Sequence, residues 1–203
     1  MRKISSLKIR LTEPLVWVMI SGVLAGFVLV NINGKTREGG VAFLNVDMLY
    51  EVKYMSIDKW AFFLYVLRKR LLVIVGLILV STTYLGVITA YSYAGWIGMS
   101  MGTICASAIY HYGIKGVLLF ITAMFPHYFF YIPAWILLLQ GVREMCFCNF
   151  FPAKRKGSYI GGRREEIQYI VVLLLKVLGV VIIGAILESY VNPRALIGLL
   201  KIF

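Results

Sequence analysis

The stretch "MFPHYFFYIPAW", Met124 to Trp135, lies inside a long apolar run and departs from a simple helical pattern. Pro126 and Pro133 each remove a backbone donor and clash with the preceding turn, which costs a helix about 3 kcal/mol or more. His127 stands beside the first proline, although ionisable side chains are costly in hydrocarbon. Membrane helices tolerate proline where neighbouring groups bind the freed carbonyls. The stretch therefore predicts a kinked or broken membrane span that shapes the helix bundle.

The composition places the whole chain in a membrane. Of its 203 residues, 61% are hydrophobic, and the mean hydropathy is +0.85. Soluble globular chains are only about 45–50% apolar. We therefore predict an all-α integral membrane protein, with residues 1–203 forming one polytopic membrane domain. The polar segments are too short to form a separate soluble catalytic domain.

About five runs approach the length that a helix needs to cross a bilayer, which is roughly 17–25 residues. The predicted spans are 15–32, 71–92, 94–111, 114–139 and 167–187. Spans two, three and four are joined by very short connections, so we expect them to be antiparallel neighbours. The first run lacks a clear small-residue cleavage site, which favours an uncleaved span over a signal peptide.

The connection between the first two spans has a different pattern. Within residues 41–68, three acidic side chains fall on one helical face, while Trp60 and Phe62 suit a membrane interface. This segment predicts an amphipathic interfacial helix, or alternatively a plain connector lying on the bilayer.

The charge is strongly basic, at +12 from 21 Lys and Arg residues against 9 Asp and Glu residues. Because the basic residues flank apolar runs, membrane lipids explain them better than nucleic acid does. Lys and Arg divide evenly between the two sides of the predicted membrane. The basic start of the chain favours a cytoplasmic N-terminus and an outer C-terminus. The "RKR" at 68–70 opposes this orientation unless these side chains extend to the headgroups.

Small residues recur at a spacing of four in two spans. They are Gly22 and Gly26 in the first span, and Gly98, Gly102 and Ala106 in the third. This spacing lets helix backbones approach closely. The stripes predict either packing within the bundle or a face that accepts another protein's single span, and they leave homo-oligomerisation open.

Three ionisable groups lie within or close to the predicted spans: His127, Lys176 and Glu188. Such groups are either satisfied structural partners or parts of an ion or proton path. Lys176 and Glu188 are 12 residues apart, which is about 18 Å along a helix and too far for a direct pair. The alternative function that these residues indicate is a small transporter or channel.

Catalytic patterns are missing from the sequence. The chain has no H-E-x-x-H, no G-x-S-x-G and no phosphate-binding glycine loop, and it has only 2 histidines. Its 3 cysteines, two of them in "CFC" at 146–148, do not supply the four ligands of a structural zinc site. We therefore expect a protein that is not an enzyme and that needs no cofactor or metal.

Two motifs resemble the stage II sporulation protein M family. "FPHYFFYIP" is similar to the proline-containing segment of the family's next-to-last span, and "AILESYVNP" is similar to its final-span signature. Asn192 stands where the family has a hydroxyl residue. The order of spans and loops also resembles the family over essentially the whole chain. The matching residues are Pro126, His127, Pro133, Glu188 and Pro193.

The resemblance implies a non-enzymatic membrane scaffold in an endospore-forming bacterium. In that family, the protein recruits two single-span cell-wall hydrolases, stage II sporulation proteins D and P, during forespore engulfment. It also implies a place in the septal and engulfing mother-cell membrane. On this basis, segment 41–68 and the Gly98/Gly102/Ala106 face are the predicted docking surfaces for the hydrolases.

Overall fold

The computed structural model describes residues 14–34, 58–150 and 163–200, and every regular element within these ranges is helical. The helices are α1 (Pro14–Gly34), α3 (Lys59–Ser81), α4 (Gly86–Tyr112), α5 (Ile114–Met124), α6 (His127–Phe150), α7 (Arg163–Ile186), the π-helix η3 (Leu187–Val191) and α8 (Asn192–Leu200).

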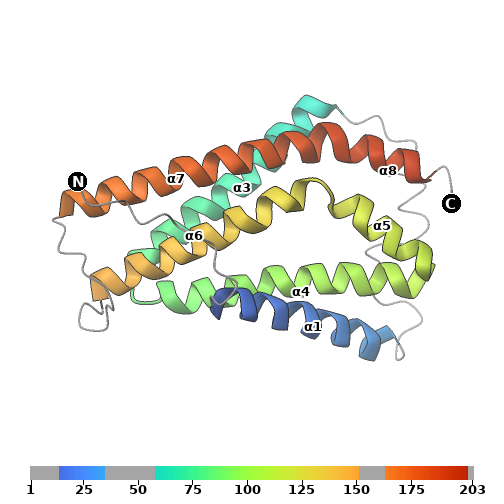
Figure 1. Ribbon diagram of the computed structural model, residues 1–203, viewed down its shortest axis with the longest axis horizontal. Coiled ribbons are helices and arrows are strands. Elements are labelled where there is room, and N and C mark those ends of the chain that lie inside the picture. Colours follow the sequence, from blue (N-terminus) through green and yellow to red (C-terminus); the bar gives the residue numbers. More distant parts are fainter. Residues whose placement is uncertain (1–13, 35–57, 151–162, 201–203) are drawn as a thin grey trace.

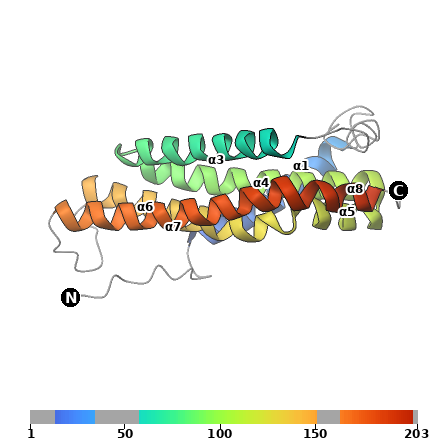
Figure 2. The ribbon, with the colours of Figure 1, turned by 90° about the horizontal axis from the view of Figure 1, so that it is seen from above.

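Most of the helices run lengthwise along the molecule and alternate in direction, and α5 is inclined to α6. In Figure 1, α1, α4 and the continuous α7–η3–α8 segment run one way, while α3 and the α5–α6 pair run the other way. Figure 2 shows the same elongated bundle from above, with α3 lying along one edge of it. Helix α1 packs against α4, and α6 packs against α7.

Large apolar side chains cover the outside of this bundle. Trp17, Leu24, Leu72, Trp96 and Leu175 are each more than 60% exposed. Such a surface fits hydrocarbon, and the chain is therefore a helical membrane protein. By length and composition, Pro14–Ile32 and Ile170–Leu199 could each cross a membrane, and the α5–α6 pair adds a third crossing if it counts as one span.

The boundary between the second and third predicted spans was wrong. Helix α3 ends at Ser81, α4 begins at Gly86, and α4 passes through 92–94 without a break. The hydroxyls of Ser81, Thr82 and Thr83 each donate to the carbonyl three residues earlier, at 2.6, 2.7 and 2.7 Å. Such side-chain bonds compete with the helical ladder, which explains why the helix stops within an apolar run.

The start of α3 also differs from the prediction. The Asp58 carboxylate accepts a hydrogen bond from the Trp60 backbone N–H at 3.0 Å and caps a helix that continues unbroken through Arg70 to Ser81. Residues 59–68 are therefore the first half of α3 and not a separate interfacial helix. The rest of the predicted connector, 41–57, lies outside the described residues.

The predicted irregularity near Pro126 is a break between two helices. Helix α5 ends at Met124, α6 begins at His127, and the two helices are bent by 64°. Pro133 lies inside α6, which continues past it to Phe150, well beyond the predicted end at 139. Of the two prolines, only Pro126 interrupts the helical course.

Candidate functional site

A side chain from the start of α8 binds the end of α5, next to the break between α5 and α6. The Asn192 side-chain Nδ2 donates to the Ala123 carbonyl oxygen at 3.0 Å. Ala123 lies in the last turn of α5, where carbonyls lack intrahelical partners because the helix ends. Asn192 therefore provides a hydrogen-bond partner for a carbonyl next to the break.

The π-helix η3 carries Glu188 in its first turn. A π-turn is a rare local widening of a helix, found often at functional sites. The Glu188 side chain is 18% exposed, and its Oε2 atom lies 3.5 Å from a guanidinium nitrogen of Arg70 on α3. An ion pair therefore joins two helices that are far apart in the sequence.

Tyr131 on α6 joins the same pair. Its hydroxyl donates to Glu188 Oε2 at 2.8 Å, and the Arg70 Cζ atom lies 4.5 Å from the centre of its ring. Arg70, Tyr131 and Glu188 form what we call the charged triad. A charge among apolar helices is costly unless it is paired and hydrogen-bonded, and the triad satisfies both conditions.

The backbone of α7 makes room for the Tyr131 ring. Tyr131 is only 1% exposed, and a Cβ atom placed on Gly184 would stand 2.6 Å from its Cε1. His127 and Tyr128 pack edge-on against the same ring, with centroid distances of 5.8 and 6.2 Å. Tyr131 is thus flanked by two other aromatic side chains from the start of α6.

Some buried polar atoms near the triad keep unused hydrogen-bonding capacity. Within the described residues, His127 Nδ1, Ser189 Oγ and Asn192 Oδ1 are buried and make no hydrogen bond. All three belong to the broken helix or to the π-turn region. They are the groups that could bind water or a small polar ligand at this site.

The structure brings together some of the predicted site residues and separates others. Glu188 belongs to the triad, buried His127 lies against it, and Pro126 and Pro193 lie beside the break and beside Asn192. Lys176 is exposed on α7, 12 residues before Glu188 and therefore about 18 Å away. Pro133 lies within α6, near the aromatic cluster but not at the break.

The predicted small-residue stripes face each other inside the chain. A Cβ atom on Gly98 or Gly102 would collide with the backbone oxygens of Met19 and Val23, and one on Gly22 or Gly26 would collide with those of Gly95 and Met99. Ala106, the last member of the stripe on α4, is buried as well. Because α1 occupies this face, the Gly98/Gly102/Ala106 stripe packs within the chain and is not open to a partner helix.

Sequence reasoning missed Arg70, Tyr131 and Asn192 as members of the site. The signal for Arg70 was the presence of Glu188 in an apolar span, since a buried carboxylate requires a cation at the same depth. Lys176 was excluded by its spacing, which left the "RKR" run as a source of that cation. For Tyr131 and Asn192, no signal in the sequence separates them from neighbouring aromatic and polar residues.

The fold and this site define an all-helical membrane protein whose helices are linked by an ion pair next to a broken helix. Residues 15–193 match the family model described as Stage II sporulation protein M. Because the match covers most of the chain, the protein belongs to that family, and it is a sporulation-related membrane protein. No curated protein and no solved structure matches the chain significantly.

Proposed function

We propose that this protein is a non-enzymatic scaffold in the bacterial cell membrane that recruits and localises peptidoglycan hydrolases, stage II sporulation proteins D and P, for forespore engulfment. The observation that carries the proposal is the family match over residues 15–193. We place the scaffold in the septal and engulfing mother-cell membrane, where those hydrolases would act.

The alternating helix directions support a five-pass arrangement, in which α3 and α4 cross the membrane as well. Helix α3 has 23 residues, about 34 Å in length, which is enough to cross. The basic run at 68–70 makes α3 more polar than an ordinary membrane span. Pairing of Arg70 with Glu188 lowers the free-energy cost of placing this arginine in the membrane. In this arrangement the start of α1, the end of α6 and the start of α7 share the cytoplasmic side.

The charged triad favours a scaffold over a transport path. Arg70 and Glu188 neutralise each other, and Tyr131 donates to the same carboxylate oxygen. These contacts tie α3, α6 and η3 together, so the ionisable groups act as links between helices. Such a rigid frame is suited to positioning other proteins.

A pull-down from sporulating cells tests the scaffold. Tagged full-length protein should enrich both hydrolases relative to an unrelated multi-span protein of equal abundance. The variant Glu188→Gln should reduce this enrichment, because the frame loses its ion pair, while Lys176→Gln should not. If neither hydrolase is enriched with the unaltered protein, the scaffold proposal is wrong.

A second candidate function is a small transporter or channel that uses His127, Lys176 and Glu188. The broken helix beside a π-turn favours it, together with the unpartnered buried atoms of His127 and Ser189. Discontinuous helices form ion and substrate sites in many transporters. Flux into vesicles containing the purified protein, lost in His127→Asn and Glu188→Gln, would support this function. Vesicles containing the unaltered protein that conduct nothing, while the same protein enriches both hydrolases from cells, would exclude it.

A further inference from the structure

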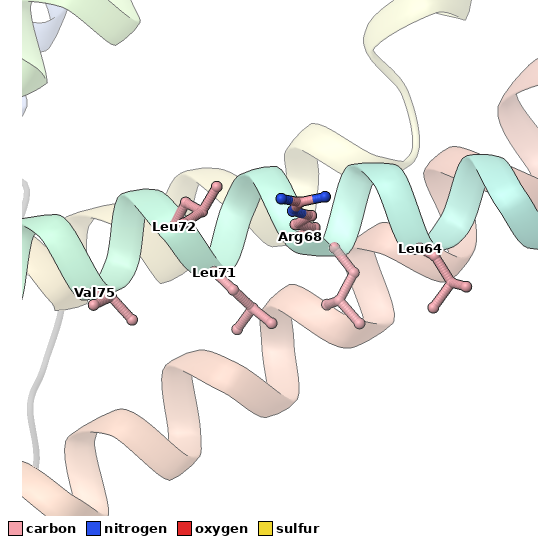
Figure 3. Close-up of a pocket in the computed structure, with 6 residues that line it drawn as sticks. Leu64, Arg68, Leu71, Leu72 and Val75 are labelled. Carbon is pink, nitrogen blue, oxygen red and sulfur yellow. The ribbon is translucent and has the colours of Figure 1, made fainter.

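The outer side of α3 carries an open groove of about 340 Å³. It is lined, entirely from α3, by Leu64, Leu67, Arg68, Leu71, Leu72 and Val75. Figure 3 shows Leu64, Leu71 and Val75 projecting from one side of the helix, with Arg68 and Leu72 on the adjoining strip. Leu64, Leu72 and Val75 are 47%, 63% and 53% exposed, so the described helices leave this side of α3 uncovered.

The spacing of the groove residues is that of a helix-packing seam. Leu64, Arg68, Leu71 and Val75 follow one another at intervals of four, three and four residues. This is the interval of the a and d positions of a heptad, which insert side chains between those of a facing helix. The four side chains therefore share one strip of the helix surface. We call these four residues the α3 seam.

Arg68 occupies one seam position, and its surroundings differ from those of its two basic neighbours. Arg70 is paired with Glu188, and the Lys69 Nζ atom lies 4.7 Å from the centre of the Tyr65 ring. Arg68 is exposed and forms no salt bridge within the described residues. Charged side chains on membrane helices almost always pair with another group, so a carboxylate is the complement of this position.

We propose that the α3 seam binds a single transmembrane helix of another protein, with a carboxylate of that helix opposite Arg68. The proposal rests on α3 crossing the membrane, as proposed above. The leucine and valine positions would contribute contact area, and Arg68 would set the register and select the partner. A single polar residue in an otherwise apolar seam is a known means of specifying partners.

A second copy of the chain is a poorer occupant than such a helix. A symmetric pair uses the same surface on both copies. Two parallel α3 helices packed through this seam would place one Arg68 against the other, and like charges repel. Charge complementarity therefore points to a different protein that supplies the acid.

Designed peptides provide a direct test. Full-length protein carrying a fluorescent tag is placed in phosphatidylcholine vesicles with single-span leucine–alanine peptides that have glutamate, glutamine or lysine at the centre. Energy transfer reports binding. We expect the glutamate peptide to bind about tenfold more tightly than the glutamine peptide, which corresponds to about 1.4 kcal/mol.

Variants of Arg68 and a matched control decide the assignment. Arg68→Gln should abolish the preference for the glutamate peptide, and Arg68→Glu should prefer the lysine peptide. Lys176→Gln removes another exposed cation from an apolar helix, α7, and should keep the full preference. The conservative variant Arg68→Lys keeps the charge and should retain part of the preference. Far-ultraviolet circular dichroism of each variant should match that of the unaltered protein.

Three results would overturn the proposal. The first is equal binding of the glutamate and glutamine peptides to the unaltered protein. The second is loss of the preference when phosphatidylglycerol replaces part of the lipid, which would identify a lipid phosphate as the occupant. The third is energy transfer between two differently labelled copies that disappears in Arg68→Gln, which would identify a second copy. The hydrolase pull-down is independent of these peptides, so either proposal can fail without the other.

Discussion

The interface between α1 and α4 and the contact region of α3, α6 and η3 hold helices together by opposite means. The first uses Gly22, Gly26, Gly98 and Gly102, whose missing side chains let the two backbones touch. The second uses long side chains: a guanidinium, a phenol and a carboxylate that meet within hydrogen-bonding and ion-pairing range. The α1–α4 interface depends on glycines that have no side chain, and the α3–α6–η3 contact depends on paired charges.

This difference determines how each interface responds to change. A glycine contact joins two helices and fails when volume is added, whatever the chemistry of the added group. The charged triad joins three elements and fails when one charge is removed, even if the volume is preserved. Substitutions that add side-chain volume without changing the charge, or remove a charge while keeping the volume, therefore test the comparison.

The largest effect is expected for Arg70→Met. The variant preserves much of the side-chain volume but leaves Glu188, which is 18% exposed, without its cation. Breaking one partner of a buried pair costs about 3–5 kcal/mol, and partial exposure places this site at the lower end of that range, at about 3 kcal/mol. Equilibrium unfolding in mixed micelles measures the loss.

Two controls accompany Arg70→Met. The exchange of Arg70→Glu with Glu188→Arg should recover part of the stability, and Lys176→Met on the exposed face of α7 should change it by less than about 0.5 kcal/mol. If Arg70→Met behaves like Lys176→Met, the ion pair contributes nothing to the frame.

The next effect is expected for Gly98→Leu in α4. Its Cβ atom would overlap the Met19 carbonyl, so α1 must move away from α4, at a cost of about 2 kcal/mol. Gly179→Leu is the matched control, because nothing lies within 4 Å of a Cβ atom there. Unfolding of both variants in the same micelles gives the comparison. Equal stability of the two would contradict the close approach of α1 and α4.

A smaller effect is expected for Tyr131→Phe. The change keeps the ring over Arg70 but removes the hydroxyl that donates to Glu188 at 2.8 Å. A hydrogen bond to a charged group contributes about 1.5 kcal/mol or more. Unfolding measurements should show a loss of that size, and Tyr65→Phe, at an exposed ring on α3, should show almost none. Similar losses in both variants would count against the role of this hydroxyl.

The smallest effect is expected for Asn192→Ala. The Ala123 carbonyl loses its side-chain donor, which should cost about 1 kcal/mol. Because the bond lies at the end of α5, amide hydrogen exchange should rise mainly around residues 120–130. Uniform exchange along the whole chain would show that Asn192 stabilises the bundle in general and not the break in particular.

Much of this architecture was predictable from apolar length and from proline chemistry. The all-helical membrane class and the interruption at Pro126 followed from those two principles, as did the position of Glu188 near the end of the last long helix. The α3–α4 boundary was not predictable in the same way. A run of Ser81, Thr82 and Thr83 is tolerated within many membrane helices. Here their hydroxyls bind carbonyls of the last turn, and Cys146 of α6 donates to the Thr83 and Tyr84 carbonyls, which the sequence does not indicate.

The members of the site were harder to predict than its location. Glu188 and His127 are conspicuous in an apolar sequence, whereas Arg70 belongs to a basic run that resembles an interfacial flank. Its role depends on α3 continuing through the run, which is a matter of tertiary contacts with α6 and η3. In the structure the three basic residues of that run lie in different surroundings. Arg68 is exposed, Lys69 lies over the Tyr65 ring, and Arg70 pairs with Glu188.

The π-turn η3 keeps the buried row of α7 facing the other helices as the chain passes into α8. The buried residues Leu173, Val177, Val181, Ala185 and Ser189 recur at every fourth position. An α-helix completes a turn in 3.6 residues, so such a row drifts around the helix, and the wider turn compensates for part of the drift. A π-turn closes its hydrogen bonds one residue later than an α-turn does, so it holds one extra residue at the place where the row would otherwise drift away from the core. Ser189 therefore stays in the buried row, and Asn192, three residues later, reaches the Ala123 carbonyl at the end of α5.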